Sequence, residues 1–226
     1  MKYIIALILS VFSVIIAYCT LDNHLSNKIV LLKKKDNDDY KPKELHKIHV
    51  WIICVIIFVL NNISILSIID NVDDYINVIK MIITIMCVTG AACNDYREHR
   101  IPNIFPLIIA VTGIVCLITG YLVNQQGAQA YIVSSLFATA AVALAMIIIY
   151  MLTKHGIGMG DIKLLCALSL LGGVYLICGT VFFAMIVCSL TAIILLITKK
   201  KTIKEGIPFG PFIYFGFIVS IILLVY

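Results

Sequence analysis

The sequence is a series of long apolar runs separated by short polar segments, and this pattern limits what the chain can fold into. A helix needs about 20 apolar residues to cross a bilayer, and 62% of the 226 residues are hydrophobic whereas only 13% are charged. The runs are continuously apolar and do not alternate, which favours helices over a barrel. We therefore predict an all-α polytopic membrane protein with about eight transmembrane helices. The expected spans are near 3–21, 49–69, 76–93, 104–123, 131–153, 162–172, 174–198 and 209–226.

Two of these runs need a further decision. The sixth run is too short to cross a bilayer alone, and Gly172-Gly173 predicts a tight turn into the seventh. The first run follows Lys2, as in a signal peptide, but it has no clear small-residue cleavage site, so we expect a retained helix. The predicted regions are a two-span region at 1–76, with a basic loop at 22–48, and a second membrane region at 77–226 that carries the motifs described below.

The basic residues gather in segments that would share one side of the membrane. With helices at these positions, that side holds 15 of the 17 Lys and Arg residues, and only Lys2 and Lys80 fall elsewhere. Basic segments of polytopic proteins remain in the cytoplasm, so we predict a multi-pass protein of the cell membrane with both termini outside. The net charge of +5 then reports topology, and we expect the lipid bilayer, not nucleic acid, as partner. The four segments are 22–48, 94–103, 154–163 and 199–208.

The cysteines and histidines give no sign of a metal site. All eight cysteines lie within or at the ends of apolar runs, and none stands in a C-x-x-C pair. The five histidines form no ligand spacing with cysteines or acids. The cysteines are typical of small packing residues, and we predict no metal and no cofactor.

Two acids stand out because each adjoins an apolar span. Asp95 follows the third expected span, and Asp161 opens the sixth after the glycine-rich run Gly156-Ile-Gly-Met-Gly160. Ionisable groups near the bilayer are costly, so they are functional candidates. Each also has a structural interpretation: Asp161 could cap a helix, and Asp95 could pair with a neighbouring arginine. Since both are expected at the same membrane face, they can meet.

Three motifs resemble those of the type IV prepilin peptidases, which are intramembrane aspartyl proteases of the GxGD type. Gly158-Met-Gly160-Asp161 matches the GxGD signature, and Asp95 to Asn103 and Ile207 to Phe212 match the flanking motifs in the family's order. The resemblance covers about residues 77–216. The first 76 residues match poorly.

The resemblance implies a membrane aspartic endopeptidase that removes short basic leader peptides from type IV prepilins or pseudopilins at the cytoplasmic face. It implies that Asp95 and Asp161 are catalytic and that Gly158 and Gly160 shape the substrate site. Two carboxyl groups held close together share a proton, so one can act as base and the other as acid. The dipole of the following helix favours Asp161 as the ionised base, although the sequence does not decide the roles. We expect Pro208, Gly210 and Pro211 to interrupt the last span and shape the site.

Other interpretations remain open. An archaeal preflagellin-type peptidase would use the same chemistry, and a small transporter could use Asp95 and Asp161 as a proton or cation site. A transporter would be expected to place its acids near the bilayer midplane and to contain inverted repeats, neither of which is indicated here. Many members of the resembled family also methylate their products, and these members carry a cysteine-rich cytoplasmic domain between the first two spans. The corresponding segment of this chain is 22–48. This segment contains no cysteine, so N-methyltransferase activity is doubtful.

Overall fold

The structure is a computed structural model, and it describes residues 2–21, 47–71, 75–123, 127–153, 157–198 and 207–224. All regular structure in these ranges is helical, which confirms the all-α prediction. Much of the predicted basic loop at 22–48 lies outside the described residues. The helices are α1 (Lys2–Leu21), α3 (Lys47–Asn71), α4 (Tyr75–Glu98), α5 (Ile104–Leu122), α6 (Ala128–Leu152), α7 (Met159–Ile197) and α8 (Gly210–Leu224).

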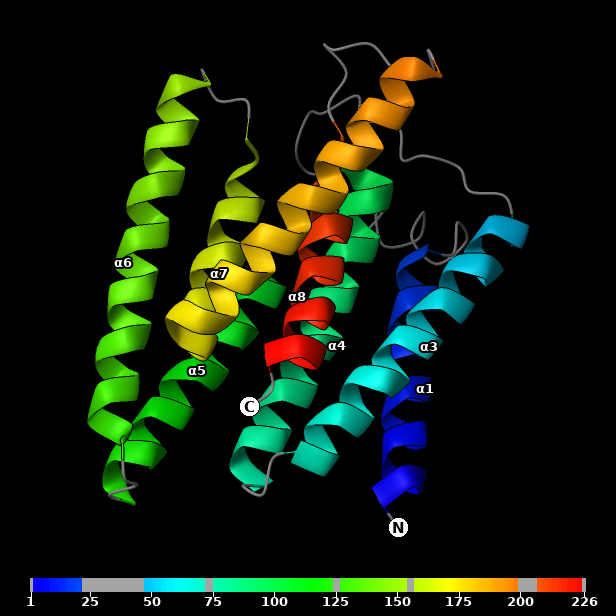
Figure 1. Cartoon of the computed structure of the whole chain (residues 1–226). Helices are drawn as coiled ribbons and strands as arrows, with labels where there is room; N and C mark the ends of the chain where they lie inside the picture. Colours follow the sequence, from blue (N-terminus) through cyan, green and yellow to red (C-terminus); the bar gives the residue numbers. More distant parts are fainter. Residues whose placement is uncertain are drawn as a thin grey trace, which may run out of the picture.

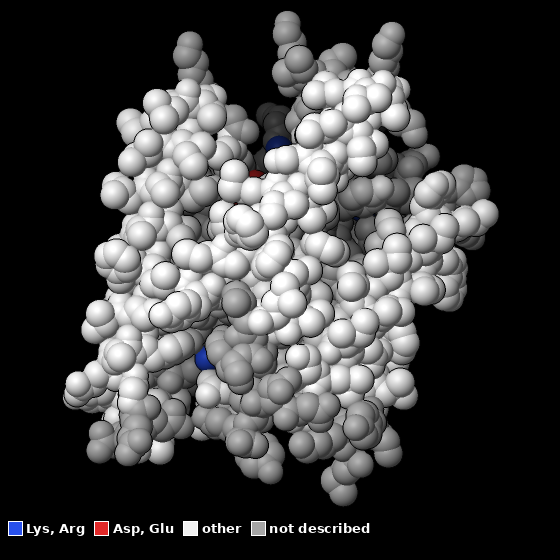
Figure 2. All heavy atoms as spheres, in the orientation of Figure 1, with Lys and Arg blue, Asp and Glu red and all other residues white. Residues whose placement is uncertain are grey.

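Five of these helices are long and apolar enough to cross a membrane, and α1 and α8 add shorter apolar stretches. Figure 2 shows a surface of mostly uncharged atoms, with red and blue visible only in recesses. Large apolar side chains such as Leu136 and Phe137 on α6 are exposed, as lipid-facing side chains should be. The protein is therefore a polytopic membrane protein. Eight apolar runs were expected, and the described residues form seven helices. The difference arises because the sixth and seventh runs belong to one bent element, α7.

Helix α7 folds back on itself at the predicted glycine pair. Gly173 has φ 67° and ψ −166°, a conformation that L side chains rarely adopt. Two side chains of α6 satisfy the backbone groups that the bend frees: the Val174 N–H donates to Ser134 Oγ at 3.2 Å, and the Tyr131 hydroxyl donates to the Leu171 carbonyl. In Figure 1 the two arms of α7 form a V, with both ends of the helix at the same end of the molecule.

The helix ends that flank the predicted cytoplasmic segments lie together. In Figure 1 α1, α4 and α6 run upward to their ends, and α3, α5 and α8 run downward from their starts, whereas the marked chain termini lie lower in the view. This is the arrangement that the charge distribution predicted for the described residues. The side of the membrane that this upper end faces stays a prediction.

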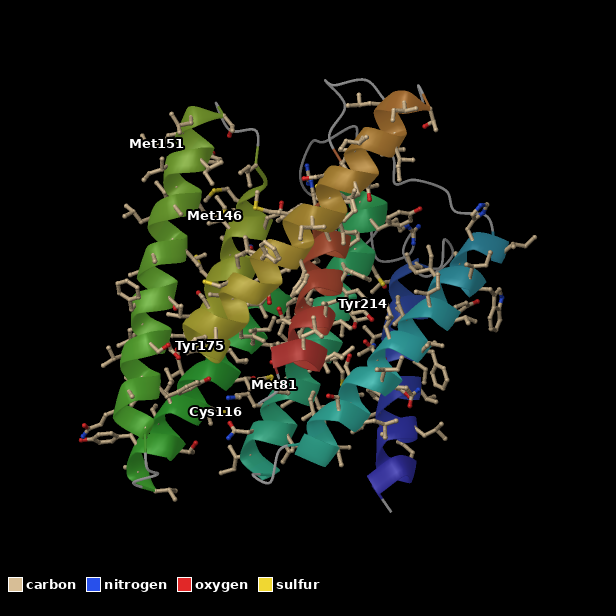
Figure 3. The ribbon with its side chains drawn as sticks, in the orientation of Figure 1. Met81, Cys116, Met146, Met151, Tyr175 and Tyr214 are labelled. Carbon is tan, nitrogen blue, oxygen red and sulfur yellow. The ribbon has the colours of Figure 1, made fainter. Side chains whose placement is uncertain are left out.

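Helix α4 is the most buried of the five long helices, and it packs against α1, α5 and α8. A buried polar cluster connects it with its neighbours. The Asn61 side chain of α3 donates to Ser13 Oγ of α1 at 2.8 Å and to Thr89 Oγ1 of α4 at 3.3 Å. It accepts from the hydroxyl of Tyr214 of α8 at 2.7 Å, and Figure 3 labels this tyrosine between the helices. The division into two regions at residue 76 stays a prediction. The hydrogen bonds of Asn61 join α3, which precedes this position, to α4 and α8, which lie after it or span it.

Candidate active site

Asp95 lies inside the last turn of α4, so this helix is longer than the expected span, which ended at residue 93. Its side chain is only 5% exposed. The helix ends at Glu98. The next residue, His99, has a left-handed φ of 50°, and its N–H donates to the Asp95 carbonyl at 2.9 Å. A left-handed residue that closes the last turn in this way is a common helix stop. The acid is therefore fixed on a rigid, buried helix end.

The start of α8 meets the Asp95 carboxyl group. The Gly210 N–H donates to Asp95 Oδ2 at 2.7 Å across 115 residues of sequence. A Cβ on Gly210 would lie 2.8 Å from the Asp95 Cβ, so only glycine allows this approach. Because Gly210 is the first residue of α8, the positive end of that helix dipole faces the carboxylate. A backbone donor of this kind stabilises the charged form of a carboxyl group.

Asp161 is the third residue of α7, after the N-cap residue Gly158. It is therefore not the helix cap, and the capping interpretation of the sequence is wrong. A Cβ on Gly158 would lie 3.0 Å from Asp161 Oδ2, which shows that the carboxyl group folds back over this glycine. Its other oxygen, Oδ1, is buried and has no hydrogen-bond partner among the described residues. The backbone of Gly158 is ordinary, with φ −68° and ψ 133°, so this glycine provides space and not an unusual conformation.

The structure brings the two acids together. Asp95 and Asp161 lie close enough to interact electrostatically, although the two residues are 66 positions apart in the sequence. The connection after α4 is packed on the start of α7: a Cβ on Gly160 would lie 2.9 Å from the Ile101 Cβ. Lys163 Nζ donates to Asn103 Oδ1 at 3.0 Å in the same region. These contacts place the start of α7 beside the connection that follows α4.

The predicted interruption of the last span is present. Ile207 and Pro208 have no regular structure, and α8 begins at Gly210 with Pro211 as its second residue. Proline suits this position because the first N–H groups of a helix have no partner within the helix. Of the three residues expected to shape the site, Gly210 contacts Asp95 directly, and the two prolines flank it.

Sequence reasoning missed one neighbour of Asp95, the imidazole of His99. His99 acts on Asp95 electrostatically, and its position only four residues after Asp95 in the sequence could have indicated it. Arg97, an arginine that the sequence offered as a partner for Asp95, contacts the end of α1. It is 1% exposed, and its Nη1 donates to the Thr20 carbonyl at 3.2 Å, so it ties α4 to the end of α1.

Within the part of the chain that the structure describes, no three His, Cys, Asp or Glu side chains gather in a way that could hold a metal ion. The site therefore offers a buried and a half-buried carboxyl group, the backbone N–H of Gly210 and the imidazole of His99. Carboxyl pairs of this kind can pass a proton between them and activate a water molecule without any further group.

Comparison with known proteins gives one match. The model of the type IV leader peptidase family matches residues 81–196, slightly more than half of the chain. The match includes both Asp95 and Asp161 and ends before Gly210. No curated protein and no solved structure matches the chain.

Proposed function

Because the chain belongs to the type IV leader peptidase family, we propose that it is a membrane aspartic endopeptidase with Asp95 and Asp161 as its catalytic pair. The observation that supports this most directly is that the buried Asp95 and the half-buried Asp161, from distant helices, lie close enough to interact electrostatically. Buried like charges have no ordinary packing role, because burying an uncompensated charge is costly. Family membership supports the protease activity, and the buried pair supports the aspartic type.

The pair would hydrolyse a peptide bond by general acid–base catalysis. One carboxylate takes a proton from a water molecule, which attacks the scissile carbonyl carbon, while the other carboxyl group donates its proton to the carbonyl oxygen. Collapse of the tetrahedral intermediate returns a proton to the leaving amine and breaks the C–N bond. The two groups exchange roles in each cycle, so neither a metal nor a covalent enzyme intermediate is needed.

We assign the base to Asp95, the reverse of the expectation from the helix dipole of α7. That expectation did not include the Gly210 N–H and the start of α8, which stabilise a charge on Asp95. Asp161 Oδ1 has no donor among the described groups, so Asp161 is the better holder of the shared proton. Infrared difference spectra test the assignment: Asp161→Asn should remove the protonated-carboxyl band at neutral pH. Loss of that band in Asp95→Asn alone would reverse the roles.

The proposed substrates are type IV prepilins or pseudopilins with short basic leaders, cleaved at the cytoplasmic face of the cell membrane. The concentration of 15 of the 17 Lys and Arg residues in four segments supports a cytoplasmic position for the end that carries the acids. Both termini would then lie outside. An archaeal preflagellin-type substrate remains the nearest alternative. Leader cleavage would need no cofactor, and methylation of the product remains doubtful for a chain without the cysteine-rich segment.

The geometry favours a peptidase over a small transporter. The acids lie at helix ends on one side of the bundle, whereas a transport site is expected near the midplane, at the interface of inverted repeats. Reporter fusions in the predicted loops after α4 and before α7 test the same point. Both should report the cytoplasm, and opposite sides would exclude an acid pair and favour the transporter.

The direct test is cleavage of a co-expressed prepilin, followed by a gel shift. The unaltered protein should remove the leader, and Asp95→Asn should leave it in place at an equal amount of membrane-inserted protein. Addition of a chelator to purified enzyme should not change the rate. Complete processing by the Asp95→Asn variant would overturn the proposed mechanism.

A further inference from the structure

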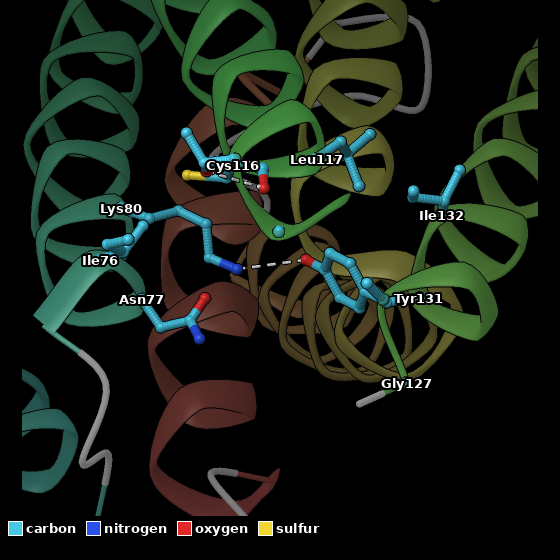
Figure 4. Close-up of a pocket in the computed structure, with 11 residues that line it drawn as sticks. Ile76, Asn77, Lys80, Cys116, Leu117, Gly127, Tyr131 and Ile132 are labelled. Carbon is cyan, nitrogen blue, oxygen red and sulfur yellow. Dashed lines mark hydrogen bonds between the residues drawn. The ribbon is translucent and has the colours of Figure 1, made fainter. Parts of the chain in front are cut away.

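A small polar cavity lies between α4, α5 and α6, at the end of the bundle away from the two aspartates. It has a volume of about 150 Å³ and is lined by residues that include Asn77, Lys80, Thr119 and Tyr131, shown in Figure 4. Lys80 precedes Asp95 by 15 positions on α4, which is about 22 Å along a helix axis. The proposed proteolysis does not use this cavity.

The cavity contains a buried positive charge. The Lys80 side chain is only 5% exposed. Its Nζ donates to the Tyr131 hydroxyl at 3.2 Å and lies 5.0 Å from the centroid of the tyrosine ring. The Tyr131 hydroxyl donates in turn to the Leu171 carbonyl at the bend of α7. The tyrosine therefore provides a hydrogen-bond donor for this carbonyl and also orients the ammonium group of Lys80. An ammonium group has three donors, and no ion pair to Lys80 is found among the described residues.

The start of α6 adds to the positive potential. Its N-cap residue, Gly127, has φ 86° and provides no side-chain cap. Gly127 and Ala128 both line the cavity. The uncapped N–H groups of a first turn attract anions through their partial positive charge. Thus a buried ammonium group and a helix start meet in one cavity, and both favour a negatively charged oxygen ligand.

We propose that this cavity binds a phosphate group, and that an anionic phospholipid supplies it. The cavity exceeds the roughly 30 Å³ that one water molecule occupies in the liquid several times over, so a tetrahedral oxyanion fits. It lies at the ends of helices that cross the membrane, which is the depth of the headgroups, and a lysine ammonium group binds phosphate oxygens through charge-assisted hydrogen bonds. Figure 2 shows blue at the bottom of a hollow in the lower half of the molecule, open to the surrounding surface. A bound phosphate would brace α4, α5 and α6 against each other.

The test is native mass spectrometry of the purified protein after exposure to phosphatidylglycerol, phosphatidylcholine or inorganic phosphate. The unaltered protein should retain phosphatidylglycerol at least fivefold better than phosphatidylcholine. Lys80→Met should abolish this preference, because it removes the charge and keeps the chain length. Lys163→Met is the matched control: it removes an exposed lysine from the other end of the bundle and should leave retention of this lipid unchanged.

A second variant keeps the test decisive if Lys80→Met does not fold. Cys116 also lines the cavity, so Cys116→Phe should fill it without removing the ammonium group, and retention should fall as far. Retention of inorganic phosphate that depends on Lys80, without a lipid preference, would support the phosphate site and assign it to free phosphate. Equal retention of both lipids, or unchanged retention in the two cavity variants, would overturn the proposal. None of these outcomes depends on peptidase activity.

Discussion

Two buried polar regions of this protein differ in how their groups are satisfied. Around Asn61, each amide and hydroxyl group has a partner on another helix or on its own backbone. Around Asp95 and Asp161, by contrast, one carboxyl oxygen has no partner among the described residues, and two acidic groups lie close enough to interact electrostatically. Satisfied buried networks stabilise and specify a fold, whereas an unsatisfied one is costly to keep. The difference indicates that the Asn61 cluster holds the helices together and that the aspartate pair is kept for chemistry.

The largest expected effect comes from Asp161→Asn. The variant cannot share a proton with Asp95, so cleavage should fall by at least the factor of about 10² to 10⁴ that general acid–base catalysis contributes. Its thermal stability should not fall, because an asparagine amide is uncharged, like the protonated Asp161 carboxyl group that we propose beside Asp95. Peptide cleavage and a thermal unfolding scan on the same preparation check both parts. A clear loss of stability would show that the aspartate supports the fold, as Asn61 does.

Asn61→Leu should produce the opposite pattern. The substitution removes three hydrogen bonds that join α3 to α1, α4 and α8. Interhelical hydrogen bonds in membranes contribute about 0.6 kcal/mol each on average, so the protein should lose about 2 kcal/mol of stability. The folded fraction should cleave substrate at nearly the normal rate. Unfolding by a denaturing detergent measures the first value, and single-turnover cleavage measures the second.

Two glycines on α8 allow the active site and the helix packing to be compared by the same change, the addition of one methyl group. Gly210→Ala would place a Cβ 2.8 Å from the Asp95 Cβ, and displacing a catalytic group by about 1 Å can cost about 10² in rate. Gly216→Ala would instead press on Thr180 and Ala184 of α7, and such overpacking costs about 1–3 kcal/mol of stability. We expect mainly lost activity in the first variant and mainly lost stability in the second. Equal losses of activity would show that Gly210 has no special relation to the site.

Much of this arrangement could be predicted from the sequence because it follows from local composition. Span positions follow from the apolar runs, the shared end of the helices from the basic segments, and the bend of α7 from Gly172-Gly173. The meeting of Asp95 and Asp161 follows from the same topology, since both adjoin helix ends on one side.

The remainder depends on packing between distant segments, which no local pattern records. The Gly210 N–H reaches Asp95 only because α8 begins beside the end of α4. The helix-dipole argument for Asp161 as base considered one helix at a time and could not include this donor. Similarly, Asn61 lies in an apolar run, and nothing in the sequence connects it with Ser13 or Tyr214. Only the packed helices show which polar groups are satisfied.

The smallest expected effect comes from Lys163→Met, which removes a polar contact at the site that is exposed and not buried. Lys163 Nζ donates to Asn103 Oδ1 at 3.0 Å where solvent can replace either partner. Exposed polar pairs contribute about 0–1 kcal/mol, and even 0.5 kcal/mol of transition-state energy is only about a twofold change in rate. Although Lys163 belongs to the conspicuous glycine-rich motif, its loss should therefore change cleavage by about twofold and stability hardly at all. Steady-state cleavage rates of the Lys163→Met and Gly210→Ala variants, measured side by side, test this difference. Asn103→Ala is the control, because it removes the other partner of the same hydrogen bond. A fall in cleavage rate of about 10² in Lys163→Met would mean that this lysine contacts substrate. Burial would then not distinguish the catalytic groups of this protein from the structural ones.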